Sequence, residues 1–318
     1  MNKSFGSYFS LEIPGNSQNI YYPGAKRLNT GRNALEYLVK ILPIKKIYLP
    51  YMSCDALFTP LKRQKIPYEF YEIDSNFNPI FDFSCIKQNT FFLYINYYGI
   101  KSTTVKDLAT RVSNLIVDNS QAFFCKPEKS VPTFYSLRKF FGVSDGALLL
   151  NVPQNIPLNR DNSAHRMGYL IKRVENEVEF AFDEYQQVEE ELDQVELLEM
   201  SDLTQKIYTS IDFKTHLKAR NSNFKFLNRR FREVNMLKID EYEGPLAYPL
   251  WIPKGAEVRN KLRKERIYLP TYWPNVLNMV GNQTQEYKLS KNILPIPVDL
   301  RYTHEDLEFI AKKIISLL

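Results

Sequence analysis

Two residues near the middle of the chain, Asp118 and Lys139, have the types and positions needed for chemistry on a heterocyclic cofactor. Asp118 ends the apolar run 115–117, which is typical of a buried parallel strand that delivers a carboxylate to the carboxyl edge of its sheet. Lys139 follows a second strand-like run at 132–136. A carboxylate can pair with a protonated ring nitrogen, and a lysine can form a Schiff base with an aldehyde. The two residues therefore predict a cofactor site at one edge of a sheet.

The residues around this pair follow a known order and spacing. Gln121 lies three positions after Asp118 in VDNSQA, Lys139 ends FYSLRK, and the pair Asp145-Gly146 starts six positions after the lysine. That interval favours Lys139 over the neighbouring Arg138. The segments resemble the motifs EDxAQ, SFxxxK and EGG of the sugar aminotransferase family of DegT, DnrJ, EryC1 and StrS. The resemblance implies a fold-type-I transferase that uses pyridoxal phosphate.

The resemblance also implies a role for each residue. Lys139 would hold the cofactor as a Schiff base and later, as a free amine, move protons at the substrate carbon. Asp118 would keep the pyridine nitrogen protonated, so that the ring can accept electrons. Gln121 would lie against the ring or its 3-oxygen. The phosphate-binding serine of the motif falls on Phe134 here, and Ser136 is expected to replace it.

A phosphate site is predicted at the start of the first helix. The segment TGRNAL (30–35) begins a helix that runs to about residue 40, with a capping residue before it. The first turn of a helix carries unpaired N–H groups and a partial positive charge, which suit a phosphate. TGRNAL resembles the family's SGTAAL, and this resemblance places Gly31, Arg32 and Asn33 at the cofactor phosphate.

Three further positions depart from the family pattern. Cys54 stands where an aromatic residue stacks on the cofactor ring, so either nearby Tyr51 covers the ring or the stacking is weak. Residues 200–203 match the family's MSDL, but the Asn and Arg before it, which reach the partner subunit's site, become Leu197 and Glu199. These departures leave an alternative open, a family member that has lost transamination and serves as a binding or regulatory protein.

The strand and helix signals predict an α/β fold. Strand-like runs alternate with helical segments over the first half of the chain, at 46–50, 68–73, 90–96 and 115–118. This alternation implies a mostly parallel sheet sandwiched by helices, which agrees with fold type I. We expect a large cofactor-binding domain over residues 1–214, which opens with an extended arm of about 28 residues.

The second half is expected to differ from the first. Residues 151–175 are polar and irregular, 182–200 form an acidic helix, and 201–236 are rich in helix. Residues 215–318 form a smaller α+β C-terminal domain in this prediction, and its last helix starts after Thr303 with a capping box. Tyr272-Trp273 resembles a segment near the family's substrate entrance, and core packing explains these aromatics equally well.

Composition excludes several other classes of protein. The net charge of +6 over 318 residues is modest and its basic residues are scattered, which disfavours nucleic-acid binding. No apolar run approaches the roughly 20 residues of a membrane span, so a cytoplasmic protein is expected. Three cysteines without CxxC spacing and three isolated histidines indicate neither a disulfide framework nor a metal centre.

Together these patterns predict a homodimeric aminotransferase that uses pyridoxal phosphate. Its substrate would be a keto-sugar, nucleotide-linked in the family, and its amino donor an amino acid such as glutamate. Dehydration of a sugar, which in this family accompanies a histidine at the lysine position, is disfavoured by Lys139.

Overall fold

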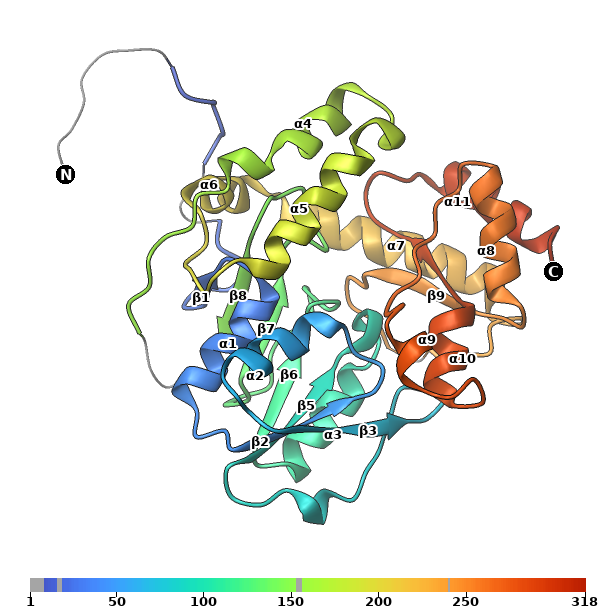
Figure 1. Cartoon of the computed structure of the whole chain (residues 1–318). Coiled ribbons are helices and arrows are strands. Elements are labelled where there is room, and N and C mark those ends of the chain that lie inside the picture. Colours follow the sequence, from blue (N-terminus) through green and yellow to red (C-terminus); the bar gives the residue numbers. More distant parts are fainter. Residues whose placement is uncertain (1–8, 16–18, 153–155, 240) are drawn as a thin grey trace.

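The computed structural model describes residues 9–15, 19–152, 156–239 and 241–318. An eight-stranded sheet forms the centre of the larger part of the molecule, and a two-stranded sheet belongs to the C-terminal part (Figure 1). The strands of the larger sheet are β1 Lys26–Leu28, β2 Lys46–Pro50, β3 Tyr68–Ile73, β4 Pro79–Ile80, β5 Thr90–Ile95, β6 Leu115–Asp118, β7 Thr133–Ser136 and β8 Ala147–Leu150. The mostly parallel α/β sheet expected from the sequence is confirmed.

The strands of the larger sheet follow the order β1-β8-β7-β6-β5-β2-β3-β4. The pairs formed between β3 and β7, through β2, β5 and β6, are parallel, while β8, β1 and β4 pair antiparallel to their neighbours. Every residue of β5 and β6 is buried, as expected when helices cover both faces of a parallel sheet. Asp118 is paired in register with Ile95 on one side and Phe134 on the other, so its carboxylate lies at the carboxyl edge of the central strands.

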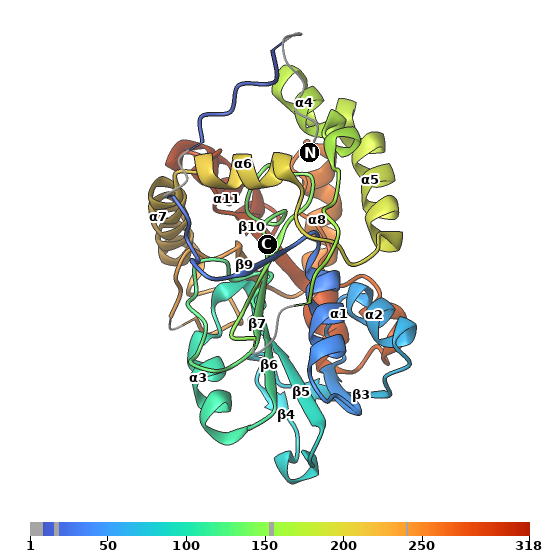
Figure 2. The same ribbon diagram turned by 90° about the vertical axis from the view of Figure 1, so that its left-hand side faces the viewer.

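Helices cover the two faces of this sheet. Figure 2 shows α1 (Gly31–Ile41) and α2 (Phe58–Arg63) on one face and α3 (Ser102–Arg111) on the other. The first helix begins where the sequence predicts, because Thr30 has an extended backbone and its side chain accepts a hydrogen bond from the N–H of Asn33. Its middle residues, 33–39, are all buried against the sheet and its surroundings.

A helical hairpin follows the sheet. It consists of α4 (Gly168–Glu175) and α5 (Phe182–Gln194), and it stands above the sheet in Figure 1. The sequence predicts irregular structure for residues 151–175, and α4 departs from this. No residue of α4 is buried, so its apolar side chains do not join the core, although Leu170, Ile171 and Val174 recur at helical spacing.

The C-terminal part packs helices around a small antiparallel sheet. The long helix α7 (Phe213–Phe231) leads into β9 (Ala247–Trp251), which pairs with β10 (Ile293–Pro297). The predicted capping box is confirmed, since Thr303 and Asp306 bond reciprocally at the start of α11. The other helices are α6 Asp202–Ser210, α8 Gly255–Lys264, α9 Val276–Met279, α10 Gln285–Asn292 and α11 His304–Ile315. The predicted domain boundary between residues 214 and 215 falls in the first turn of α7 and stays a prediction.

The described part of the N-terminal arm lies on an aromatic cluster. Tyr22 donates its phenol hydrogen bond to the carbonyls of Phe123 and Cys125, at 2.6 and 3.0 Å. Its ring centroid is 4.6 Å from that of Tyr135. The arm then forms β1, which closes the sheet at β8. Among the helices of the described residues, none is both long enough and apolar enough to cross a membrane.

Candidate functional site

Asp118 is a buried carboxylate at the end of β6. Its side chain is 6% exposed, and its Oδ1 accepts a hydrogen bond from the backbone N–H of Ser120 at 2.7 Å. Burial raises the pKa of the Asp118 carboxyl above the ordinary value, while the charge of Lys139 and the hydrogen bonds from Ser120 oppose that rise. An ionised Asp118 in this setting favours a positively charged partner.

Lys139 lies beside this carboxylate, although the two residues come from different strands. It follows β7, the neighbour of β6 in the sheet, and its charge acts on both Asp118 and the thiol of Cys54. The side chain of Lys139 is exposed, so its amine is accessible to a small molecule. The structure therefore brings together the two residues on which the sequence analysis depends.

Gln121 follows β6 in the chain and lies at the same edge of the sheet, where it contacts the segment after β5. Its Oε1 accepts a hydrogen bond from the backbone N–H of Tyr98 at 2.8 Å, and its side chain is 2% exposed. Tyr98 has a positive φ of 55°, and Gly99, at φ 75°, passes so near residue 121 that an added Cβ would lie 3.1 Å from its carbonyl oxygen. The amide nitrogen of Gln121 has no hydrogen-bond partner within the described chain and remains able to donate.

The start of α1 faces two serines from the sheet edge. A Cβ built on Gly31 would lie 3.4 Å from the Oγ of Ser120 and 3.9 Å from the Cβ of Ser136. In the first turn, Thr30 caps the N–H groups of Asn33 and Ala34. Those of residues 31 and 32 have no hydrogen-bond partner within the described chain. Two free N–H groups and two hydroxyls at a helix N-terminus form a cradle for an anion.

The side chains of Arg32 and Asn33 extend away from this cradle. Arg32 pairs with Asp193 and donates to the carbonyl oxygen of Leu192, at the end of α5. The amide of Asn33 donates to the carbonyl oxygen of Glu196 at 2.7 Å. Both side chains hold the end of the helical hairpin on α1. A phosphate at this helix start would therefore meet the backbone of residue 32 rather than the arginine side chain.

Cys54 lies at the site, in the place where the family resemblance expects an aromatic ring. Its Sγ is 3.4 Å from Oδ1 of Asp55, and burial raises the pKa of the Cys54 thiol while the charge of Lys139 opposes that rise. The ring of Tyr51 stacks on Phe70, with centroids 5.0 Å apart, so Tyr51 is already paired with another ring.

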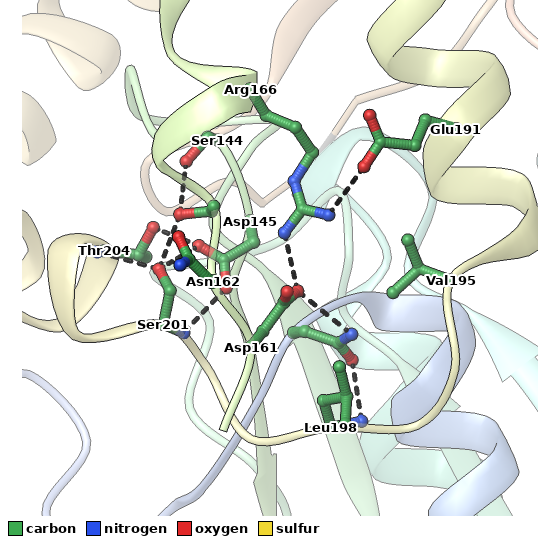
Figure 3. Close-up of polar contacts among 12 residues, drawn as sticks. Ser144, Asp145, Asp161, Asn162, Arg166, Glu191, Val195, Leu198, Ser201 and Thr204 are labelled. Atoms are coloured by element: carbon green, nitrogen blue, oxygen red, sulfur yellow. Dashed lines mark hydrogen bonds and ion pairs between the residues drawn. The ribbon is translucent and has the colours of Figure 1, made fainter. Parts of the chain in front are cut away.

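A buried polar network holds the turn after Lys139 in place (Figure 3). Asp145 is fully buried, and it accepts hydrogen bonds from the backbone N–H and the hydroxyl of Ser201 at 2.8 and 2.7 Å, and from the hydroxyl of Thr204. Ser201 also caps α6. The N–H of Gly146 donates to the carbonyl of Asn29 at 2.5 Å. Asp145 therefore ties the turn between β7 and β8 to α6, and Gly146 ties it to the residue before the cap of α1.

A buried arginine organises the neighbouring segment in the same view. The side chain of Arg166 is 2% exposed and bonds to Asp161 at 2.7 Å and Glu191 at 3.0 Å (Figure 3). Nearby, Leu197 is buried, and Glu199 pairs with Lys26 at 2.7 Å. The side chains of Leu197 and Glu199 thus both make contacts within their own chain.

Three contributors to the site carry little signal in the sequence. Ser120 hydrogen-bonds Asp118, and its place two positions after that residue is the only sequence signal for this role. Tyr98 positions Gln121, and the ring of Tyr98 lies 5.8 Å from that of Tyr272 in the C-terminal part. Arg138 bonds to the helical hairpin. The described residues contain no cluster of three side chains that could hold a metal ion.

Comparison with known proteins places this fold. The mostly parallel sheet with helices on both faces matches the fold of the fold-type-I aminotransferases. No family model and no curated protein matches the sequence. Solved structures do match, and the matches include sugar aminotransferases of the DegT, DnrJ, EryC1 and StrS group.

Three examples show the extent of that likeness. The putative sugar aminotransferase Spr1654 from Streptococcus pneumoniae, in its apo form, matches with a TM-score of 0.65 and 14% identity, over 95% of this chain and 87% of that one. PseC of Helicobacter pylori, an aminotransferase involved in pseudoaminic acid biosynthesis, matches with a TM-score of 0.63 and 14% identity, over 94% of this chain and 88% of that one. A DegT DnrJ EryC1 StrS aminotransferase from Brucella abortus matches with a TM-score of 0.63 and 13% identity, over 92% of this chain and 85% of that one. The resemblance predicted from the motifs is therefore confirmed at the level of the fold.

Proposed function

We propose that the protein is a pyridoxal phosphate-dependent aminotransferase that acts on a keto-sugar. In this proposal the sugar is nucleotide-linked, and the amino donor is an amino acid such as glutamate. The observation that carries the proposal is the meeting of Asp118, Lys139 and the anion cradle of Gly31 at one edge of the sheet. Spr1654, which shares the fold, has also been solved in a PMP form, with a TM-score of 0.62 and 14% identity.

The residues present fit the parts of this cofactor. The phosphate would lie at the backbone N–H groups of residues 31 and 32, with the hydroxyls of Ser120 and Ser136. The carboxylate of Asp118 would pair with the ring nitrogen, and the free amide nitrogen of Gln121 would donate to the 3-oxygen. The thiol of Cys54 would stand beside the ring in place of an aromatic side chain.

The chain's own groups then have defined tasks. When bound, pyridoxal phosphate supplies an aldehyde that accepts the amino group and a ring that withdraws electrons from the substrate carbon. Lys139 would hold the cofactor covalently and afterwards move a proton at that carbon. The buried carboxylate of Asp118 would keep the ring nitrogen protonated. Asp145 would fix the turn that follows Lys139 through its hydrogen bonds from Ser201.

Cofactor loading tests this proposal directly. Purified protein mixed with pyridoxal phosphate is expected to show a visible absorbance band, and borohydride reduction is expected to leave a covalent adduct on the peptide that contains Lys139. Lys139→Ala should lose both signals. Lys87→Ala, at an exposed lysine that lies outside the site, should keep both. A folded wild-type protein that stays colourless and yields no adduct contradicts the proposal.

One observation favours a second candidate function. Leu197 is buried and Glu199 is held by Lys26 and Arg160, so neither offers the polar contacts that the family resemblance expects for the partner subunit's site. A member altered in this way could bind a ligand in a regulatory role without transamination. The two candidates differ in one measurement, because only the enzyme transfers an amino group from a labelled amino acid to a sugar acceptor.

A further inference from the structure

Arg138 is the residue directly before Lys139, and its side chain is largely buried against the helical hairpin. The side chain is 16% exposed, and its Nη2 pairs with Oε1 of Glu189 on α5. The Nε of Arg138 is buried and has no hydrogen-bond partner within the described chain. A guanidinium that keeps a buried, unused donor can accept a further anionic partner, because its fork of donors matches a carboxylate.

The partner of Arg138 is easier to displace than Arg138 itself. Glu189 is 43% exposed, so its carboxylate can leave toward water while the arginine stays in place. Burial lowers the pKa of Arg138, but the carboxylate of Glu189 and the phenol of Tyr169 outweigh that effect and raise it overall. The guanidinium is thus a fixed positive charge, and Glu189 neutralises it in the absence of a competing anion.

The neighbours of Arg138 connect it to the rest of the site. Tyr185 of α5 interacts electrostatically with both Arg138 and Tyr272. Tyr272 lies against Tyr98, whose N–H bonds to Gln121. Tyr98 and Tyr272 therefore lie in ring contact beside Gln121, and Tyr185 on the hairpin acts electrostatically on both Tyr272 and Arg138.

An amino-acid donor brings a carboxylate that this site must recognise. The two positions at which the family resemblance places polar cross-subunit groups hold Leu197 and Glu199 here. Leu197 is buried and apolar, and the carboxylate of Glu199 is paired with Lys26, so neither side chain can donate a hydrogen bond to a carboxylate. The donor's carboxylate thus requires a cation from elsewhere in the chain.

We propose that Arg138 binds the carboxylate of the amino donor, and that this carboxylate takes the place of Glu189 on the guanidinium. The inference rests on the proposed aminotransferase function and adds to it the residue that selects an acidic donor. Glu189 then competes with the donor's carboxylate for Arg138. A donor must bind tightly enough to break the ion pair between Glu189 of the helical hairpin and Arg138.

Calorimetric titration of the full chain with glutarate tests the inference. Glutarate carries carboxylates but no amino group, so it binds without being consumed. Arg138→Met should weaken glutarate binding by about tenfold or more, since a charge-assisted hydrogen bond is lost. Arg138→Lys should retain part of the affinity, because the charge remains but the fork does not. Glu189→Gln should bind glutarate several times more tightly than wild type, because the competitor is gone.

A matched pair elsewhere in the chain serves as the control. Arg111 and Asp107 form an exposed ion pair on α3, and Arg111→Met and Asp107→Asn should bind glutarate as the wild type does. Equal affinity in wild type and Glu189→Gln would overturn the inference, and that variant keeps Arg138 in place if Arg138→Met fails to fold. A wild-type protein that binds no glutarate would overturn it as well.

The outcomes also separate this inference from the proposed function. Cofactor uptake is read by absorbance and glutarate binding by heat. A protein that takes up the cofactor but binds glutarate independently of Arg138 defeats only the inference. A protein that binds glutarate through Arg138 and never takes up the cofactor defeats the aminotransferase proposal, and it leaves Arg138 as a carboxylate site of a binding protein.

Discussion

At the scale of single residues, the site depends on a carboxylate that is costly to ionise without a cationic partner. Asp118 lies on a fully buried strand, and burial raises its pKa against the opposing effects of Lys139 and Ser120. A ring nitrogen that carries a proton would supply a further positive charge. The same burial that makes Asp118 effective toward a cofactor therefore destabilises the chain without one.

This cost has a measurable dependence on pH. Because the pKa of Asp118 is raised in the folded chain, the folded state binds its proton more tightly than the unfolded state. The resulting stability is complete below the ordinary aspartate pKa of 3.8 and is lost as the pH rises through the higher folded value. In urea unfolding without cofactor, the free energy of unfolding of the wild type should therefore fall relative to that of Asp118→Asn as the pH rises over this range.

An exposed aspartate provides the comparison. Asp107→Asn, on α3, should follow the wild-type pH profile. If wild type and Asp118→Asn instead show the same change in the free energy of unfolding with pH, Asp118 is not ionised at a cost in the folded chain. Asp118→Asn should also weaken cofactor binding by about tenfold or more, because a charge-assisted hydrogen bond becomes a neutral one.

At the scale of elements, the anion cradle exists because α1 begins at a defined residue. The hydroxyl of Thr30 accepts from the N–H of Asn33 at 3.1 Å, and the N–H groups of residues 31 and 32 stay unpaired where Gly31 lies close to Ser120 and Ser136. Fraying of the first turn would move those donors, so the cap of α1 serves both stability and binding.

Two threonine caps separate these effects. Thr30→Ala should lower the free energy of unfolding by about 1 kcal/mol and also weaken the binding of pyridoxal phosphate, measured by absorbance titration. Thr303→Ala removes the cap of α11, away from the site, and should cost about the same stability without changing cofactor affinity. Equal cofactor affinities in the two variants would show that the start of α1 does not hold the phosphate.

The elements that could be predicted from the sequence are those with a strong local signal. The amino-acid sequence predicts the apolar runs of β5 and β6 and the caps of α1 and α11. The helix α4 was not predicted, although Leu170, Ile171 and Val174 recur at helical spacing, because it is only 8 residues long and lies in a largely polar stretch. The pairing of Arg138 with Glu189 was not predictable either, because it joins a strand end to a helix 51 positions later and depends on how α5 packs.

At the scale of the whole molecule, the C-terminal part closes onto the edge of the large sheet. The amide of Asn275 donates to the carbonyl of Ser53 at 2.9 Å, and the N–H of Leu246 donates to the carbonyl of Tyr98 at the same distance. Trp273 is buried, with its ring 5.7 Å from that of Tyr98. The proposed cofactor site and the C-terminal part therefore share one packed boundary.

The two tryptophans report on that boundary. Cofactor binding is expected to quench the fluorescence of Trp273 strongly, because Tyr98 links its ring to Gln121 at the site. Trp251 lies in β9, paired with Ile293 of β10, and should be affected less. Trp251→Phe should keep most of the quenching and Trp273→Phe should lose most of it. The reverse order would place the cofactor elsewhere.

The arm before β1 is held by hydrogen bonds to residues far away in the sequence. Asn19 donates to the carbonyl of Thr209, 190 positions on, and the phenol of Tyr208 bonds to Tyr22 across 186 positions. During synthesis on the ribosome, this first segment leaves the exit tunnel long before its binding partners exist. The nascent chain must therefore keep an aromatic-rich leading segment unpaired while most of the protein is still being translated, and chaperone engagement in cells should concentrate on that interval.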